Sequence, residues 1–353
     1  GESDRDARLD LGGTALSALG LGLVVFGILR AGAWGFVNPK PGAPVWIGLS
    51  PTIWLMLGGG LVLLVFAAWE KRRVEAGQSV LIDPTILRNP VLRGGLTAFL
   101  FQFLLQAGLF FCVPLYLSVA LGLSAVETGI RILPLSITLL LAAVGVPKIW
   151  PQASPQRVAR FGFLGLLAGI VSLMGALELG AGPEIVTLPL LLAGLGIGAL
   201  ASQLGAVTVS SVPDEQSPEV GGLQNTFTNI GASVGTALAG AILVSALTTS
   251  FFTGIQDNPA IPETLTSKAQ VEFAGGIQFI PDSDLEAALS KAGITGDTAQ
   301  AIMEENSQSR IAGLRAALAA LAVLAIAALF STGSLPTRQG QSDADAKVPA
   351  GLS

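Results

Sequence analysis

The sequence predicts an all-α polytopic membrane protein with eight transmembrane helices. Eight stretches of the chain contain no Asp, Glu, Lys or Arg, and most of them reach the length of about 20 helical residues that crosses a hydrocarbon layer. Only 12% of all residues are charged, whereas 51% are hydrophobic. Since a charge at the bilayer centre costs about 2.5–3.5 kcal/mol, uncharged stretches of this length indicate helices that lie in lipid.

Charged residues bound the eight expected spans. In chain order the boundaries are Asp10 and Arg30, Lys40 and Glu70, Arg93 and Glu127, Arg131 and Lys148, Arg160 and Glu178, Glu184 and Asp214, Glu219 and Asp257, and Arg315 and Arg338. The fourth and fifth spans are short, but charged side chains at their ends can reach the membrane surface. Buried helices of a soluble protein would carry a polar stripe, whereas Leu318–Phe330 is apolar on every side.

The spans divide the chain into six expected regions. They are a cytoplasmic stub (1–10), two extra central transmembrane helices (11–70), a cytoplasmic linker (71–93), a six-helix unit (94–247 and 311–331), an acidic extracytoplasmic helical loop (248–310) and a cytoplasmic tail (332–353). The chain begins at Gly1, and its polar stub enters a span without the pattern of a signal peptide. We therefore expect it to be the later part of a longer protein.

The distribution of basic residues predicts that both termini face the cytoplasm. With the first stub inside, that side collects twelve basic residues, namely Arg5, Arg8, Lys71, Arg72, Arg73, Arg88, Arg93, Lys148, Arg157, Arg160, Arg338 and Lys347. The short connections on the other side hold only Arg30, Lys40 and Arg131. Cytoplasmic loops carry an excess of Lys and Arg, so this orientation in the cell (plasma or inner) membrane is the expected one.

The loop 248–310 holds nine acidic and three basic residues, so it accounts for the net charge of −5 of the whole chain. Its pattern predicts three short helices: the first from Pro262 to Ala274, the second ending near Gly293, and the third running from about Thr298 into the final span. This loop could cap a pathway or bind cations, although a solvated acidic surface is the simpler interpretation.

The composition argues against an enzyme. Histidine is absent and Cys112 is the only cysteine, so no Cys/His metal site is expected. The phosphate-binding pattern of ATP-driven motors is also absent. Gly196, Gly198 and Ala201 match a loose dinucleotide pattern, but they lie in an apolar helix and indicate close helix packing. No buried carboxylate is expected in any span, and neither a cofactor nor nucleic acid is expected as a partner.

Uncharged polar residues inside the spans are the candidates for a substrate cavity. Gln102 and Gln106 share one face of the third span with Phe110, and Phe103 lies beside them. Asn225 and Asn229 have the same spacing in the seventh span. Such groups turn toward other helices or a water-filled cavity, where they either line the cavity or form hydrogen bonds between helices. Gly231 and Gly235 follow the asparagines as a Gly-x-x-x-Gly pattern, which favours close packing.

Several sequence runs carry a resemblance to a known family. They are Pro114–Leu117, Leu121–Ala125, Thr128–Pro134, Asp83–Asn89, Gly222–Thr226 and Asn229–Gly235. These runs resemble the C-terminal half of the fourteen-span drug:proton antiporters of the major facilitator superfamily, the EmrB/QacA family. The resemblance covers essentially the whole chain and maps it to spans seven to fourteen. One departure is the loop Val146–Arg157, which lacks the Gly and Asp of the degenerate signature that the family often keeps there.

The resemblance implies a proton-coupled secondary transporter that exports amphipathic drugs or related small molecules by alternating access. Its partners would be the lipid bilayer, an amphipathic substrate, protons and a missing N-terminal six-helix half, which in this family holds most substrate and proton determinants. The residues Gly196, Gly198, Gly231 and Gly235 would permit the helix movements of gating. Two alternatives stay open: an exporter of one defined metabolite or antibiotic, and a membrane scaffold or sensor that uses the acidic loop.

Overall fold

The computed structural model describes residues 10–337, apart from 38, 41, 77–83 and 266–277. Within these residues eight helices are long and apolar enough to cross a membrane, and no strand forms. The eight are α1 (Leu11–Trp34), α2 (Pro51–Glu75), α3 (Pro90–Pro114), α4 (Ala125–Ile149), α5 (Pro155–Ala176), α6 (Thr187–Val209), α7 (Ser217–Asp257) and α10 (Asp297–Ser331). The predicted all-α fold with eight spans is confirmed.

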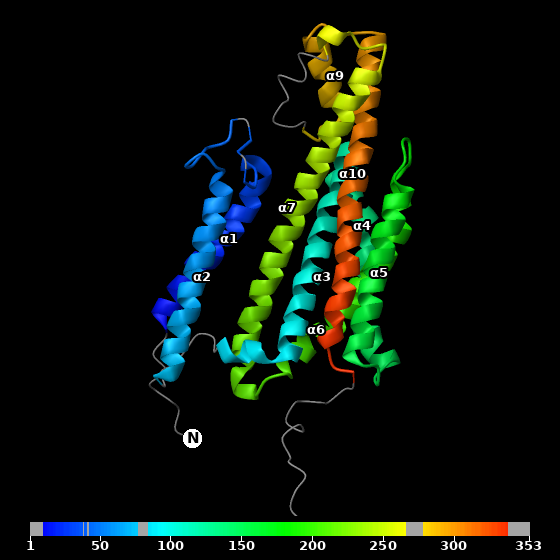
Figure 1. Cartoon of the computed structure of the whole chain (residues 1–353). Coiled ribbons are helices and arrows are strands. Elements are labelled where there is room, and N and C mark those ends of the chain that lie inside the picture. The colour runs from blue at the N-terminus through cyan, green and yellow to red at the C-terminus, as the bar shows by residue number, and fades with distance from the viewer. Residues whose placement is uncertain (1–9, 38, 41, 77–83, 266–277, 338–353) are drawn as a thin grey trace, which may run out of the picture.

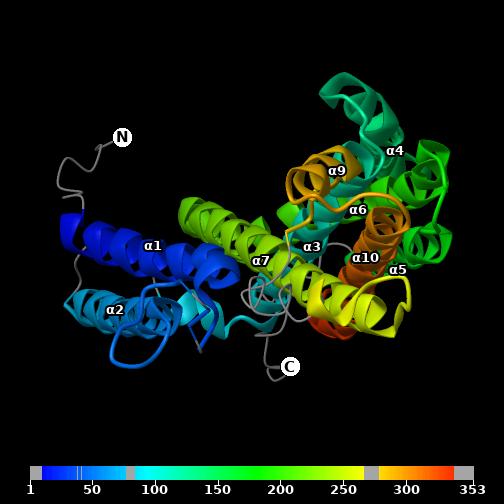
Figure 2. The same ribbon diagram turned by 90° about the horizontal axis from the view of Figure 1, so that it is seen from above.

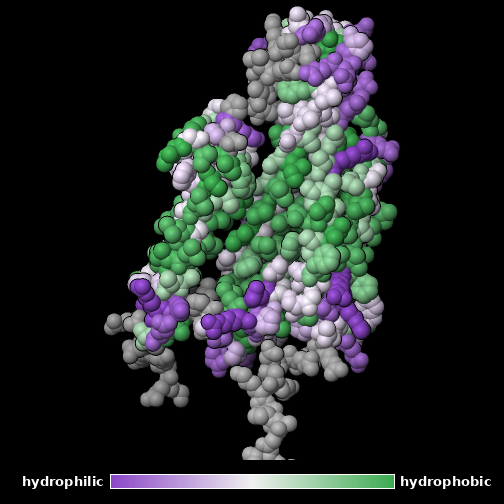
Figure 3. All heavy atoms as spheres, in the orientation of Figure 1, coloured by the Kyte–Doolittle hydropathy of each residue, from purple (hydrophilic) through white to green (hydrophobic). Residues whose placement is uncertain are grey.

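The eight helices run roughly side by side and share a hydrophobic middle. In Figure 1, α1 and α2 form a hairpin on one side, and α7 stands between this hairpin and the other long helices. Figure 2 shows the same order from above, with α4 and α5 on the side far from the hairpin. Hydrophobic residues cover the middle of the molecule, and hydrophilic residues gather at both ends (Figure 3). This banding is the one expected of a protein surrounded by lipid.

Three of the helices begin with the same local signal, a capping residue followed by proline. Ser50, Asn89 and Ser154 each accept a hydrogen bond from a backbone N–H of the first turn, and the next residue is Pro51, Pro90 or Pro155, respectively. Proline is favoured at the first helical position because its fixed φ suits the helix and its missing N–H would have no partner there. The starts of α2, α3 and α5 are therefore fixed locally.

Glycines on α6 bring its backbone into direct contact with two neighbours. A Cβ atom built on Gly196 would fall on the carbonyl oxygen of Gly162 in α5 and 2.5 Å from the backbone nitrogen of Leu166. On another face of α6, a Cβ atom on Gly198 would fall on the carbonyl oxygen of Leu139 in α4. Since neither position has room for any side chain, the glycines set the distance from α6 to both α5 and α4.

The predicted glycine pair of α7 lies against α3. A Cβ atom on Gly231 or Gly235 would fall on the carbonyl oxygen of Leu100 or Leu104, respectively. Both glycines are buried, and the contact repeats after one helical turn on each helix. The Gly-x-x-x-Gly pattern therefore packs two backbones together, and its part in gating stays a prediction.

The helices α7 and α10 are longer than one bilayer crossing requires, and they carry the loop between them. The 41 residues of α7 make a helix about 60 Å long, twice the thickness of a hydrocarbon core of about 30 Å. The expected loop runs from residue 248 to 310, and α7 extends into it as far as Asp257. The other helix, α10, begins at Asp297, close to the start at about Thr298 that is predicted for the third loop helix. The regular backbone hydrogen bonds of each span simply continue into the loop, and Figure 1 shows both helices projecting above the bundle.

In the sequence, α9 (Asp282–Lys291) lies between α7 and α10, and a buried arginine of α10 ties α9 to that helix. The side chain of Arg310 is 3% exposed, and its Nη2 atom lies 2.6 Å from Oδ1 of Asp282. Its Nη1 atom donates to the carbonyl oxygen of Ile280 at 3.0 Å. As predicted, Gly293 follows the end of α9, with a φ of +74°. The first predicted loop helix, Pro262–Ala274, lies mostly outside the described residues.

Buried carboxylates close the α1–α2 hairpin, so the prediction that none exists is wrong. Asp10 caps α1 through the N–H of Gly13, accepts hydrogen bonds from the indole of Trp69, and lies 3.3 Å from Nε of Arg73. Glu70 of α2 is fully buried and hydrogen-bonds with Asp10. Both acids bound uncharged stretches in the sequence. A helical hairpin returns to its starting level, which brings these two boundary residues together.

The surroundings of Asp10 favour its charged form. Burial would raise the pKa of this carboxyl, but the hydrogen bonds from Gly13 and Trp69 and the charge of Arg73 outweigh burial and hold the pKa below its ordinary value. The ionised carboxylate therefore stabilises the hairpin. This stabilisation is complete above the unfolded value of about 3.9 and is lost as the pH falls through the lower folded value.

We expect Asp10→Asn to weaken the start of α1 by about 0.3–2 kcal/mol at neutral pH, because asparagine can still cap the helix but lacks the charge that favours Arg73 and the helix N-terminus. Hydrogen exchange of the first turn of α1 at pH 7 would detect this as faster exchange. Glu75→Gln is the matched control, since Glu75 is exposed and lies 3.9 Å from Lys71 on the same helix end. Equal exchange in both variants would contradict a role of Asp10 in the hairpin.

Replacing Gly196 by Leu should destabilise the bundle by about 1–3 kcal/mol or prevent its folding, because the new side chain meets the α5 backbone. The apparent melting temperature in detergent would measure the change. Gly205→Leu is a control in the same helix, because a Cβ atom at Gly205 has no neighbour within 4 Å. A fall of equal size in both variants would show that the close contact of α5 and α6 is not the cause.

Candidate transport cavity

The third span presents a face of amide and aromatic side chains. Gln102 is 3% exposed, and Gln106 is half-buried one turn further along α3. Phe103 stacks on Phe99 with ring centroids 6.2 Å apart and planes 4° apart. Phe110, one turn beyond Gln106, is 39% exposed. The structure thus places the four predicted residues of α3 on one connected polar and aromatic surface.

Both glutamines hold a buried acceptor with no protein partner. The Oε1 atoms of Gln102 and Gln106 are buried and accept no hydrogen bond from any described residue. A buried amide oxygen without a partner costs about 1–3 kcal/mol, which native proteins seldom tolerate without a reason. Neither oxygen therefore forms the hydrogen bond to a neighbouring helix that the alternative interpretation of these residues requires. A hydrogen-bond donor brought by water or a ligand would remove this cost.

The geometry of α3 directs the glutamines away from α7. Leu100 and Leu104 face α7 through their contact with its glycines. Residues two positions further along a helix lie about 200° around its axis, so Gln102 and Gln106 lie on the opposite side. That side points toward α6, because Gly95, two turns before Gln102, lies against Thr208 of α6. The two amide oxygens therefore face the α6 side of the bundle.

The asparagines of α7 do not join this surface. Asn225 and Asn229 are exposed, and Nδ2 of Asn229 donates to the carbonyl oxygen of Asn225 at 2.9 Å and to its Oδ1 at 3.2 Å. The pair thus satisfies part of its hydrogen bonding along its own helix. The structure brings Gln102, Gln106, Phe103 and Phe110 together but leaves the asparagines apart, on a helix that meets the other side of α3.

A neighbouring glutamine, which is not among the residues predicted from the sequence, connects two helices instead. Nε2 of Gln224 in α7 donates to Oγ1 of Thr208 and, at 3.2 Å, to the carbonyl oxygen of Gly205 in α6. Gln203 of α6 is another buried amide in an apolar span. The signal that selected Gln102, an uncharged polar residue inside a span, would have found both. Within the described residues no group of three or more acidic, His or Cys side chains could hold a metal ion.

Comparison with known proteins gives a family match and partial relatives. The sequence profile described as Major Facilitator Superfamily matches residues 9–236. The Tetracenomycin C resistance and export protein of Streptomyces glaucescens is 30% identical over 243 residues, which are 67% of this chain and 41% of that protein. The probable actinorhodin transporter of Streptomyces coelicolor is 24% identical over 271 residues, 76% of this chain and 43% of that protein. The chain spans less than half the length of these two relatives.

A solved structure shows a weaker likeness. The crystal structure of a bacterial homologue of the human lysosomal transporter Spinster, in an inward-facing and occupied conformation, is 18% identical. It aligns over 94% of this chain and 67% of its own, with a TM-score of 0.49. The family match, by contrast, covers well over half of a chain with eight apolar helices. This multi-pass membrane protein therefore belongs to the Major Facilitator Superfamily, which is a family of transporters and not of enzymes.

Proposed function

We propose that this chain is the C-terminal eight-span portion of a fourteen-span drug:proton antiporter of the EmrB/QacA type. Residues 94–247 and 311–331 would form one six-helix half of the carrier, and residues 11–70 the two extra central helices. The half would rock against an N-terminal half around a cavity near the bilayer midplane, which is how this class of fold alternates access. Both termini would face the cytoplasm, where the basic residues gather.

The observation that carries the proposal is the pair of unsatisfied amide oxygens on α3. They lie in a span, among Phe99, Phe103 and Phe110, on a helix of a transporter family. An apolar substrate that carries hydrogen-bond donors would complement this face, because the amide oxygens accept hydrogen bonds and the rings provide a stacking surface. Such a mixed surface suits amphipathic compounds better than strongly polar ones.

Two further observations support a partner half. The chain spans 41% and 43% of its two named relatives, so the proteins of this kind are longer. In addition, α4 leaves a row of large apolar side chains exposed, Ile130, Leu133, Ile137, Leu140 and Val144. A second bundle could cover part of that row and lipid the remainder. The family resemblance assigns most of the proton-carrying residues to that second half, and the proposal follows it.

In the full-length parent, Gln102→Leu with Gln106→Leu should reduce drug efflux at least tenfold while leaving the melting temperature unchanged or raised. The reason is that leucine removes two buried acceptors that have no protein partner, so the fold loses no hydrogen bond at either oxygen, whereas a substrate loses two. Efflux would be measured at matched expression, with and without a protonophore.

The result separates the two interpretations of the glutamines. If they bond to other helices, the double variant should melt at a lower temperature, and any loss of efflux would follow the loss of folded protein. Gln156→Leu serves as a control for a glutamine that does hold helices together, because its Nε2 atom donates to the carbonyl oxygens of Thr332 and Gly333. Normal efflux by the double variant would remove both residues from the substrate site.

A second candidate, export of one defined metabolite or antibiotic, has its own support. Each of the two relatives described above is named for a single compound, tetracenomycin C in one protein and actinorhodin in the other. A transporter with a narrow range would use the same face of α3 but would require a closer fit of shape.

A panel of efflux substrates decides between broad and narrow export. We expect the parent to lower the accumulation of several structurally unrelated amphipathic dyes, and Phe103→Ala to weaken efflux of each by a different factor, because a stacking surface contributes differently to each ring system. Accumulation in cells with and without the parent gives the measurement. Efflux of only one compound class would favour the metabolite exporter and would end the claim of multidrug range.

A further inference from the structure

A groove runs along the outside of the bundle between α4 and α5, with α6 as its floor. It has a volume of about 390 Å³ and is lined by apolar residues, among them Leu141, Val146 and Ile149 of α4 and Leu195 of α6. The groove stays open beside α4 because Gly145 carries no side chain into it, whereas Gly165 and Gly196 contact each other's backbones at its floor. Its lining begins at the end of α4 and extends about 12 Å along that helix, from Ile149 back to Leu141.

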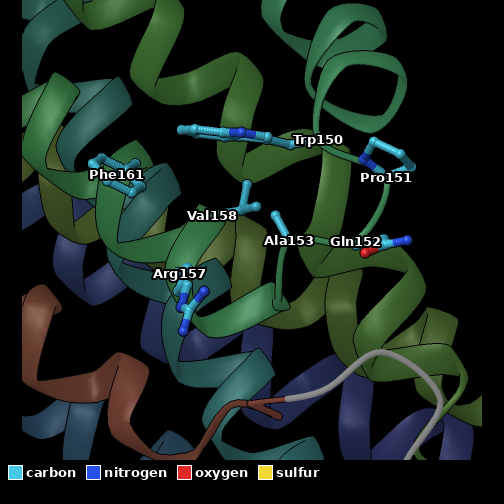
Figure 4. Close-up of a pocket in the computed structure, with 7 residues that line it drawn as sticks. All are labelled: Trp150, Pro151, Gln152, Ala153, Arg157, Val158 and Phe161. Carbon is cyan, nitrogen blue, oxygen red and sulfur yellow. The ribbon is translucent and has the colours of Figure 1, made fainter.

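A second cavity, the Arg157 pocket, adjoins the groove where α4 turns into α5. It has a volume of about 570 Å³ and is lined by Trp150, Pro151, Gln152, Ala153, Arg157, Val158 and Phe161 (Figure 4). Phe161 also lines the groove, so its ring belongs to the walls of both spaces. Trp150 lies beside it, with ring centroids 5.7 Å apart. Tryptophan at this level is typical of the boundary between membrane and water.

The charge around the pocket is entirely positive over a long stretch of chain. Between Arg131 and Glu178 the sequence holds Lys148, Arg157 and Arg160 and no acidic residue. Arg160 is engaged by Oγ1 of Thr332 at 3.2 Å, whereas Arg157 and Lys148 are exposed and form no ion pair with a described residue. The α5 helix begins at Pro155, and its N-terminus adds partial positive charge on the same side.

The two parts together describe one kind of ligand. An apolar groove at membrane depth accepts a hydrocarbon chain, and a basic, partly aromatic pocket at the adjoining surface accepts an anionic head. We propose that the groove and the Arg157 pocket form a binding site for one anionic phospholipid of the adjacent leaflet, with an acyl chain between α4 and α5 and the phosphate at Arg157. Under the proposed orientation this leaflet is the cytoplasmic one, where anionic lipids meet basic protein segments.

The site is separate from the surface proposed for transport. Every residue that lines the groove or the pocket belongs to α4, α5, α6 or the turn between α4 and α5. The glutamines and phenylalanines of the transport surface lie on α3, which lines neither space. The lipid site therefore does not depend on the transport proposal, and its test measures binding rather than efflux.

Fluorescence quenching by a brominated lipid tests the proposal directly. The full chain in detergent would be titrated with dibrominated phosphatidylglycerol, and the Trp150 signal would be taken as the difference between the chain and its Trp150→Phe variant. We expect saturable quenching of this signal, with an affinity at least fivefold higher than for dibrominated phosphatidylcholine. The reason is that phosphatidylcholine carries a positive choline next to its phosphate, whereas phosphatidylglycerol presents a net negative charge to Arg157.

Two variants address the two parts of the site. Arg157→Gln should weaken binding of phosphatidylglycerol about five- to tenfold and bring it close to that of phosphatidylcholine. Gly145→Leu should weaken both lipids, because it fills the groove at a position where a Cβ atom meets only Ile149, at 3.8 Å, and therefore leaves the helix packing intact. The matched controls are Arg93→Gln and Gly175→Leu. Arg93 is an exposed arginine near the start of α3, at the same end of the bundle as the pocket, and a Cβ atom at Gly175 has no neighbour within 4 Å. Both controls should bind as the unchanged chain does.

Three results would overturn the lipid site. The first is equal quenching by both lipids, and the second is unchanged affinity in both Arg157→Gln and Gly145→Leu when the variants elute as folded protein. The third is displacement of the bromolipid by an efflux substrate, which would make the groove part of a drug path. Glycerol 3-phosphate should not compete, because it lacks the acyl chain; competition at equal concentration would reduce the site to a phosphate pocket.

Discussion

The architecture depends on direct contact between helix backbones at glycine. In lipid, apolar side chains gain little free energy when they exchange contact with lipid tails for contact with each other. Helices therefore associate mainly through close packing and hydrogen bonds. Gly196 and Gly198 bring α6 against α5 and α4, and Gly231 and Gly235 bring α7 against α3. Each contact puts a carbonyl oxygen of one helix where the other would otherwise hold a side chain. The positions of the remaining side chains follow from these contacts.

The functional surfaces are a consequence of that packing. Because Leu100 and Leu104 are committed to α7, the glutamines two positions further on face the opposite side of α3. The same rule operates at α6, where Gly196 faces α5 while Leu195 beside it lines the outer groove. One helix can therefore hold a close contact on one side and present a ligand surface on another. The surface proposed for transport and the groove proposed for lipid lie on different helices, so substitutions can alter one without the other.

Much of the fold could be predicted from the sequence, because the signals are local. Uncharged stretches predict the eight helices, and Gly293 marks the end of α9. The sequence also placed Gln102 and Gln106 on one face, since four residues make about one turn. It could not show that Asn225 and Asn229 lie apart from them, because that depends on which face of α3 meets α7. The burial of Glu70 could not be predicted for a similar reason, because the residue beside it, Asp10, belongs to the start of another helix.

The length of α7 determines how far a tilt of this helix would displace the loop that it carries. This helix runs unbroken from its contact with α3 to its end at Asp257, and Arg310 fixes α9 to the neighbouring α10. A continuous helix behaves as a rod, so a tilt about a pivot inside the bilayer moves its far tip by more than it moves any residue near the pivot. A tilt of α7 would therefore displace the loop at its end most, and a spectroscopic label placed there would report motions that are too small to follow within the lipid.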